Sequence, residues 1–331
     1  MKFSGHVTPV DPAAVVETIC SFVRGQLASM RRDGAVVGLS GGVDSALCAR
    51  LCVEALGKSR VLGLILPERE SDPTSTEYAM SESRRLDIKT ETVDITATLE
   101  SAGAYELRNA AIRGFFPDFG GRHRSKIVLP GNLLSKSSLN FYTLVVQDES
   151  GNSRTARLNN QALRQIVAAT NIKQRMRMVY LYRSAETHNC MVCGTTNRTE
   201  SVQGFFVKYG DGGVDIEPIQ DLYKTQVYQL ARFVGVSDEI LRRPPTPDTF
   251  SLAVTDEEFY FRLPYEKLDV LLYAWESRVP VAEVCEAMDL VAEQVERVFR
   301  DLTSKYKATM HQRAQPPGPQ LEAGRVSRSA Q

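Results

Sequence analysis

The sequence of 331 residues has few cysteines, no long apolar run and no net charge. Its six cysteines do not make the disulfide framework of a secreted domain, so we expect reduced thiols. No apolar run approaches the roughly 18 residues of a membrane-spanning helix, and the N-terminus lacks the charged-then-apolar pattern of a secretory signal. These absences predict a cytoplasmic protein with no membrane partner.

The charge balance gives no reason to expect a general attraction to polyanions. The 40 Lys and Arg residues match 40 Asp and Glu residues, so no nucleic-acid partner is expected. One basic cluster contains Arg122, His123, Arg124 and Lys126. It could contact phosphate, but its ordinary density favours a solvated loop face. An anionic ligand must therefore be held by local groups.

The first third of the chain alternates between short apolar runs and helical patterns. The apolar runs span residues 35–39 and 61–67, a third strand is expected at 89–95, and the helical patterns span 12–32, 46–56 and 75–86. Such apolar runs are typical of strands buried in a parallel sheet, and their alternation with helices favours right-handed crossovers. The sequence therefore predicts an α/β fold with a doubly wound, mostly parallel sheet flanked by helices.

The stretch of residues 97–160 is less regular. An apolar run at 141–146 is followed by turn residues at 148–153 and a second short run at 155–158. This order predicts a β-hairpin. Helical spacing returns at residues 163–182.

A glycine-rich loop follows the first predicted strand and leads directly into a helix. The loop consists of Ser40, Gly41, Gly42, Val43, Asp44 and Ser45. Backbone N–H groups at such a turn, together with the positive end of the helix, favour phosphate oxygens. Ser40 and Ser45 add hydroxyl donors, and Asp44 can hold Mg²⁺ against the phosphates. The loop therefore predicts a binding site for ATP and Mg²⁺.

This loop resembles the pyrophosphate-binding loop (PP-loop) of the ATP-pyrophosphatase superfamily, which implies an adenine nucleotide alpha hydrolase-like fold. It also implies cleavage between the α- and β-phosphates of ATP. The blocks at residues 171–178, 193–200 and 204–226 are similar to those of NAD synthetase of the ammonia-dependent type. The resemblance implies that residues 1–96 and 161–313 form one domain, that 97–160 is an insertion, and that 314–331 is a flexible tail.

The resemblance also implies roles for individual residues. Asp44 and Glu200 would coordinate Mg²⁺, and Thr195 would lie beside ATP. Lys224 and Thr246 would contact the ATP phosphates, so that Asp44, Lys224 and Thr246 form the catalytic set. The dinucleotide substrate would be received by Arg175, Lys208, Asp211 and Asp215.

The implied activity is amide formation, in which a carboxylate is adenylated by ATP and then attacked by ammonia. The implied acceptor is nicotinic acid adenine dinucleotide, and the product is NAD. Residue 2 is Lys2 rather than a cysteine nucleophile, and a chain of this length has no room for a hydrolase-like domain. We therefore expect free ammonia, or a separate glutaminase that supplies it. Related synthetases are homodimers, so a homodimer is expected.

Four departures from the family pattern leave a different carboxylic acid open as the acceptor. The string after Pro245 is Thr246-Pro247-Asp248-Thr249, the segment 259–264 is unusual, and Gln312 replaces a customary lysine. The fourth departure is the 97–160 stretch, which a lid, a dimer contact or an altered acceptor pocket could each explain. A reading in which the fold only binds nucleotide, as a sensor or scaffold, is less favoured.

The string His188, Cys190 and Cys193 suggests a metal or redox site. Because no second cysteine pair accompanies it, a buried strand at residues 191–193 is favoured. A tRNA-thiolating ATP-pyrophosphatase is therefore the less favoured alternative.

Overall fold

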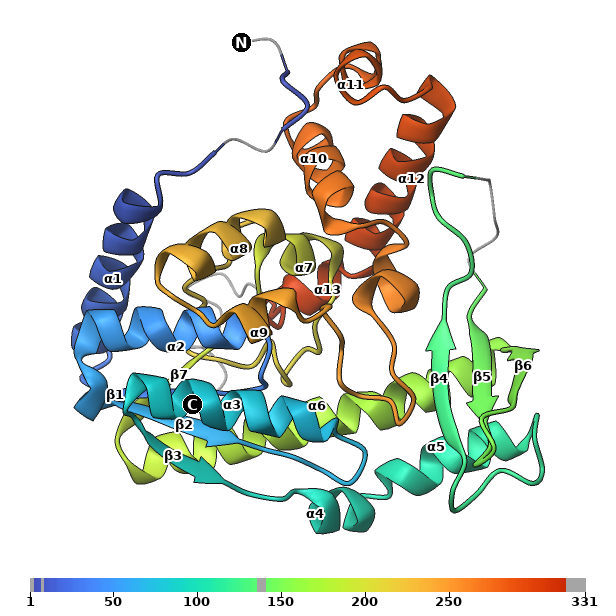
Figure 1. The fold of residues 1–331 in the computed structure, drawn as a ribbon, viewed down its shortest axis with the longest axis horizontal. Coiled ribbons are helices and arrows are strands. Elements are labelled where there is room, and N and C mark those ends of the chain that lie inside the picture. Colours follow the sequence, from blue (N-terminus) through green and yellow to red (C-terminus); the bar gives the residue numbers. More distant parts are fainter. Residues whose placement is uncertain (1–2, 7–8, 136–140, 320–331) are drawn as a thin grey trace, which may run out of the picture.

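The computed structural model describes residues 3–6, 9–135 and 141–319 of the chain (Figure 1). Most of the predicted flexible tail, residues 320–331, lies outside the described residues. The strands are β1 (Gly34–Gly38), β2 (Val61–Ile65), β3 (Lys89–Thr92), β4 (Arg124–Val128), β5 (Thr143–Gln147), β6 (Ser153–Arg157) and β7 (Cys190–Cys193). The longer helices are α1 (Pro12–Ser29), α2 (Val43–Leu56), α3 (Pro73–Leu86), α5 (Ala104–Arg113), α6 (Asn160–Thr187), α8 (Lys224–Phe233), α10 (Tyr265–Glu276), α11 (Val281–Met288) and α12 (Ala292–Ala308). The shorter helical elements are η1 (Lys58–Arg60), α4 (Thr96–Ser101), α7 (Arg198–Gln203), α9 (Asp238–Arg242), the π-helical turn η2 (Glu257–Phe261) and α13 (Met310–Arg313).

A parallel sheet with the strand order β3-β2-β1-β7 forms the centre of the molecule. Val36 of β1 pairs with Leu62 on one side and Val192 on the other. These three side chains pack with α4, α5 and α6, whereas the neighbouring Ala35 and Val37 pack with α1, α2 and α8. The sheet is therefore covered by helices on both faces, which confirms the predicted doubly wound α/β fold.

Local capping explains where the first helices begin. Asp11 accepts from the backbone N–H groups of Ala13 and Ala14, with Pro12 in the first turn of α1. Asp72 accepts from Thr74 in the same way, so α3 begins two residues before the predicted start. Helix α2 begins at Val43 rather than at residue 46, inside the predicted loop.

A second, antiparallel sheet with the order β4-β5-β6 lies in the middle segment, the name used below for residues 97–160. Strands β5 and β6 form the predicted hairpin, with Val145 opposite Thr155. Strand β4 was not predicted. Arg124 and Lys126 lie on this strand, so the expectation of a basic loop face is wrong for these two residues.

The C-terminal helices α10, α11 and α12 pack around a separate apolar cluster beside the sheet (Figure 1).

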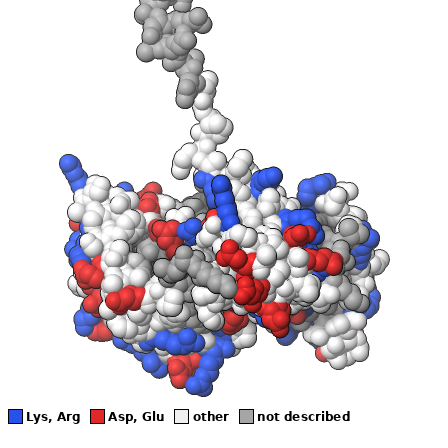
Figure 2. Space-filling view, turned by 90° about the horizontal axis from the view of Figure 1, so that it is seen from above, with Lys and Arg blue, Asp and Glu red and all other residues white. Residues whose placement is uncertain are grey.

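On the face shown in Figure 2, acidic and basic side chains lie interspersed. Among the described residues, no helix combines the length and the apolar character that crossing a membrane requires.

Candidate active site

The site lies where the chain connections of the parallel sheet change direction. Strand β1 has β2 on one side and β7 on the other, so the loops that leave β1 and β7 diverge at their carboxyl ends. Ligands of doubly wound folds bind in the crevice at such a point. A cavity of about 490 Å³ lies here, and its lining includes the loops after both strands.

The glycine loop after β1 requires a backbone that other residues rarely adopt. Gly41 has a φ of +75°, and a Cβ atom at this position would lie 2.3 Å from the carbonyl oxygen of Ser75. Gly42 is the N-cap residue of α2 and has no side chain to accept a hydrogen bond, so no cap from the described side chains satisfies the first-turn N–H groups of this helix. The turn therefore has the features of an anion-binding site.

The two serines of the loop bond to each other. Ser45 Oγ accepts from Ser40 N at 3.2 Å and lies 3.1 Å from Ser40 Oγ. Ser45 also donates to the carbonyl oxygen of Gly42 at 3.0 Å. The hydroxyl groups thus hold the shape of the loop, a role in addition to the predicted donation to phosphate.

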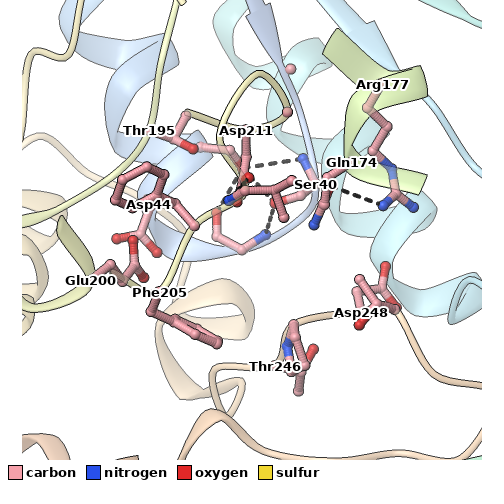
Figure 3. Close-up of a pocket in the computed structure, with 18 of the residues that line it drawn as sticks. Ser40, Asp44, Gln174, Arg177, Thr195, Glu200, Phe205, Asp211, Thr246 and Asp248 are labelled. Carbon is pink, nitrogen blue, oxygen red and sulfur yellow. Dashed lines mark hydrogen bonds between the residues drawn. The ribbon is translucent and has the colours of Figure 1, made fainter. Parts of the chain in front are cut away.

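A cluster of charged side chains lies directly beside this loop. Lys224 Nζ, at the first residue of α8, donates to Asp44 Oδ2 at 2.5 Å and to Glu200 Oε1 at 3.4 Å. Asn197 Nδ2 donates to the other oxygen of Asp44 at 3.0 Å. Figure 3 shows Asp44 and Glu200 next to each other at one end of the cavity. A third carboxylate, that of Asp256, also lines the cavity.

Burial shifts the protonation of this cluster. Burial raises the pKa of Glu200 to about 8, with Lys224 opposing the shift and Asp44 adding to it. Burial likewise raises the pKa of Asp256 to about 6, against the effect of Lys224. Burial would lower the pKa of Lys224, but Asp44 and Glu200 raise it above its ordinary value. The lysine is therefore positively charged, and the carboxylates beside it are short of positive partners.

Hydrogen bonds from neighbouring elements fix this cluster. Asn197 and Glu200 form a capping box at the start of α7, which sets the position of Glu200. The buried carboxylate of Asp269 on α10 accepts from Thr199 at 2.6 Å and from the backbone N–H of Thr225 at 2.7 Å. Helices α7 and α8 are thus tied together at the ends that carry Glu200 and Lys224.

Helix α6 forms one long side of the cavity. The lining residues on this helix are Val167, Thr170, Asn171, Gln174, Arg177, Met178 and Leu181. From Val167 to Leu181 the helix rises roughly 21 Å, because each residue adds about 1.5 Å. Arg177 donates to Gln174 at 3.2 Å, and both face Thr246 and Asp248 across the cavity in Figure 3.

Another side of the cavity is formed by residues 243–262, which we name the cavity loop. Its lining residues are Arg243, Pro244, Pro245, Thr246, Pro247, Asp248, Thr249, Asp256, Phe259 and Tyr260. Tyr142 of the middle segment lines the cavity beside Phe259, with 6.0 Å between the ring centroids. The cavity lining is therefore charged beside the glycine loop and aromatic near Tyr142.

A comparison with protein families decides the classification. The family model described as NAD synthase matches residues 15–129 and 131–316. The chain belongs to the NAD synthase family. It is 44% identical to the NH(3)-dependent NAD(+) synthetase of Mesorhizobium japonicum over 308 residues, which cover 93% of this chain and 96% of that protein. It is 38% identical to the enzyme of the same name from Thermotoga maritima over 293 residues, which cover 88% and 96%.

Solved structures share the NAD synthase fold with this chain. The NMN synthetase of Francisella tularensis superposes with a TM-score of 0.65 at 23% identity, covering 95% of this chain and 100% of that one. The NH3-dependent NAD synthetase of Campylobacter jejuni gives a TM-score of 0.60 at 21% identity, covering 94% and 100%. At these identities the likeness concerns the fold.

Most residues predicted for the NAD synthase site meet at this cavity. The lining includes Ser40, Gly42, Val43, Asp44, Ser45, Thr195, Glu200, Asp211, Lys224 and Thr246. Asp211 accepts from the backbone N–H of Val207 at 2.6 Å, and burial raises its pKa to about 6. The roles assigned to these residues stay predictions.

Three residues predicted to receive the dinucleotide lie outside the described lining of the cavity. Arg175 donates to the carbonyl oxygen of Lys208 at 3.3 Å. Lys208 donates to the carbonyl oxygens of His311 and Ala314 at the end of α13, at 2.8 and 2.9 Å. Asp215 accepts from the backbone N–H of Val192 at 2.7 Å and from Tyr182 at 3.0 Å.

Sequence reasoning missed several lining residues of the cavity. Gln174, Arg177 and Leu181 follow the i, i+3, i+7 spacing of one helical face, and this signal could have found them. Asp256 and Tyr142 carry no such signal, because their positions depend on packing between distant segments. The predicted strand at Cys193 is confirmed as β7, and the described residues contain no group of three or more His, Cys, Asp or Glu that could hold a metal ion.

Proposed function

We propose that this chain is an ATP-dependent ligase that converts nicotinic acid adenine dinucleotide and ammonia to NAD, with release of AMP and pyrophosphate. The observation that carries the proposal is the position of Lys224 beside Asp44 at the anion-binding turn, in a chain of the NAD synthase family. The relatives at 38–44% identity are named NH(3)-dependent NAD(+) synthetases, which favours this acceptor over another carboxylic acid.

The proposed chemistry has two steps. A carboxylate oxygen of the acceptor attacks the α-phosphorus of ATP, and the bond to the β-phosphate breaks, so that pyrophosphate leaves. Ammonia then attacks the carbonyl carbon of the acyl adenylate, and AMP leaves with one former carboxylate oxygen. The turn at Gly41 and the first-turn N–H groups of α2 bind the departing pyrophosphate, and Lys224 balances its growing negative charge.

The residues present fit a Mg²⁺ ion beside the phosphates. Asp44 and Glu200 provide carboxylate oxygens, which are the ligands that Mg²⁺ prefers. Asp256 Oδ1 is buried and has no hydrogen-bond partner among the described residues. Asp44 and Glu200 would hold the ion, and a bound ion would neutralise charge on the phosphate oxygens. These acidic groups outnumber the single positive charge of Lys224, which supports a cation at this end of the cavity.

The residues that bind the acceptor are supported less directly than those that bind ATP. Asp211 lines the cavity and is the predicted substrate residue that the geometry supports best. Arg175, Lys208 and Asp215 stay predicted substrate residues whose roles need direct tests. A homodimer, a cytoplasmic location and an ammonia-supplying glutaminase partner are part of the same proposal.

The test of the proposed function is a reaction with defined substrates. The purified chain is incubated with ATP, Mg²⁺, ammonium and nicotinic acid adenine dinucleotide, and NAD and AMP are measured by mass spectrometry. We expect equal amounts of NAD and AMP, and a dependence on ammonium. AMP that forms only with some other acid, without NAD, would contradict the proposed acceptor.

A further inference from the structure

The middle segment and the cavity loop are joined along their backbones. Leu252 N donates to the carbonyl oxygen of Ser125 at 3.1 Å, and Leu129 N donates to the carbonyl oxygen of Glu258 at 2.8 Å. Ser125 N donates to Ser251 Oγ at 2.9 Å. Strand β4 and the residue after it, Leu129, therefore hold the cavity loop at two places, at Ser251–Leu252 and at Glu258.

Apolar packing joins the same two parts of the chain. Phe250 and Val254 of the cavity loop are buried in one cluster with Ile127 and Leu144 of the second sheet. Phe250 also lies 5.3 Å from Phe259, measured between ring centroids. The inner side of the cavity loop is thus part of the core of the middle segment, while its other side lines the cavity.

A buried ionic network provides a third attachment. Lys173 Nζ on α6 donates to the carbonyl oxygen of Thr249 at 2.9 Å, and to Glu68 and Glu70 at 2.7 Å each. From the middle segment, Arg108 bonds to Glu70.

The second oxygen of Glu68 is also bonded from the middle segment. Tyr105 donates to Glu68 Oε2 at 2.7 Å. Burial would raise the pKa of Glu70, but Arg108 and Lys173 lower it to about 2. Glu70 is therefore ionised at neutral pH beside Arg108 and Lys173.

We infer that the middle segment positions the cavity loop in the active site, and that Lys173 is a positioning residue that fixes the loop through Thr249. Thr249 itself lines the cavity and directly follows Asp248, so a change at Thr249 displaces the neighbouring Asp248 and Thr246. The backbone between Thr246 and Thr249 is conformationally constrained, because Asp248 adopts a left-handed φ of +44°. The catalytic consequence of this inference depends on the proposed function, whereas the ordering of the loop does not.

The test uses a variant that removes the bond to Thr249 and keeps the buried charges balanced. In Lys173→Met/Glu68→Gln, one cation and one carboxylate are removed together, so Glu70 still faces Arg108. Hydrogen exchange of the cavity-loop amides, including Leu252, is measured without substrates. We expect this exchange to become at least ~10-fold faster, and the KM for ATP to rise at least ~10-fold, because small displacements of positioned groups are costly.

The matched control is Arg50→Met/Glu82→Gln on α2 and α3. Arg50 also pairs with a buried glutamate and donates to a backbone carbonyl, that of Val234. This control should lower the melting temperature by a similar amount without changing cavity-loop exchange or the KM for ATP. Unchanged exchange and KM in a folded Lys173→Met/Glu68→Gln protein would overturn the inference, and so would equal effects of the control.

A milder variant keeps the inference testable if the double variant does not fold. Ser251→Ala removes the hydroxyl that accepts from Ser125 N at 2.9 Å and donates to Ser125 O at 3.5 Å, and we expect cavity-loop exchange about fivefold faster. Wild-type exchange there would overturn the inference. Because exchange needs no turnover, it decides the ordering of the loop even if the wild-type chain makes no NAD, a result that would count against the proposed function alone.

Discussion

Two parts of the cavity lining are built in different ways. Beside the glycine loop, charged groups dominate, and the carboxylates of Asp44, Glu200 and Asp256 lie around Lys224. The aromatic part consists of Tyr142, Phe205, Phe259 and Tyr260, whose neighbouring rings lie 4.9 to 6.0 Å apart, and Phe205 lies close to Glu200 in Figure 3. The difference indicates that electrostatics drives the chemistry in the charged part, while packing holds the geometry in the aromatic part.

Removal of the central cation, Lys224, should impair the charged part of the cavity more than any other change considered below. In Lys224→Met, the buried carboxylates lose their positive partner and the phosphates lose their cation. We expect kcat for NAD formation to fall by at least ~10³-fold. Lys267→Met, a change at an exposed position of α10, is the matched control and should keep near-normal kcat. A decrease of less than tenfold in a folded Lys224→Met protein would mean that the lysine is outside the chemistry.

The carboxylates beside Lys224 test the proposed Mg²⁺ site. Asp44→Asn and Glu200→Gln keep the side-chain shape but replace one carboxylate oxygen with an NH₂ group that cannot bind the ion, so we expect each to lower kcat by roughly 10²-fold or more. The apparent affinity for Mg²⁺ should weaken with it, as measured by titration of activity with the ion. Near-normal rates with unchanged Mg²⁺ dependence would refute the metal role of that residue.

The glycine loop can be compared with a second glycine of similar φ. Gly41 and Gly57 have φ values of +75° and +81°, but a Cβ at Gly57 meets nothing within 4 Å, whereas one at Gly41 lies 2.3 Å from a carbonyl oxygen. Gly57→Ala should cost about 1 kcal/mol of unfolding free energy, and Gly41→Ala clearly more. Equal costs in chemical denaturation would argue against the tight turn.

The smallest expected effect concerns Glu217, which lies beneath the loop after β7. Its carboxylate accepts from the backbone N–H of Thr196 at 3.0 Å, and burial raises its pKa to about 8. A raised carboxyl pKa means that the folded state loses stability as pH rises from about 4.5 to about 8. Glu217→Gln should remove this loss, on the order of 1–3 kcal/mol at pH 8 and less at pH 5. A denaturation series whose pH dependence matches that of wild type would contradict the burial of this charge.

The sequence allowed the charged part of the cavity to be predicted better than the aromatic part. The glycine loop has local causes, namely a buried strand, a positive-φ glycine and a helix start, so only the first residue of α2 was misplaced. Glu200 and Lys224 were found through the family resemblance, in blocks whose order the fold preserves. A local pattern therefore located the glycine loop, and the resemblance supplied the charged residues beside it.

The parts of the fold and of the cavity lining that were not predicted depend on contacts between distant segments. Strand β4 is short and begins with three polar residues, Arg124, Ser125 and Lys126, so its pairing with β5 was not visible in the chain itself. Tyr142 and Asp256 reach the cavity only because the middle segment packs on the cavity loop. Arg175 was chosen by resemblance, whereas its neighbour Gln174 has the side chain that lines the cavity.

The most direct test of the central claim follows a single oxygen atom. Nicotinic acid adenine dinucleotide labelled with ¹⁸O in its carboxylate is converted in the presence of ATP, Mg²⁺ and ammonium, and the products are weighed by mass spectrometry. Adenylation at the α-phosphorus predicts one ¹⁸O atom in each AMP and none in pyrophosphate. Label in a phosphate product other than AMP, or AMP without label, would contradict the account.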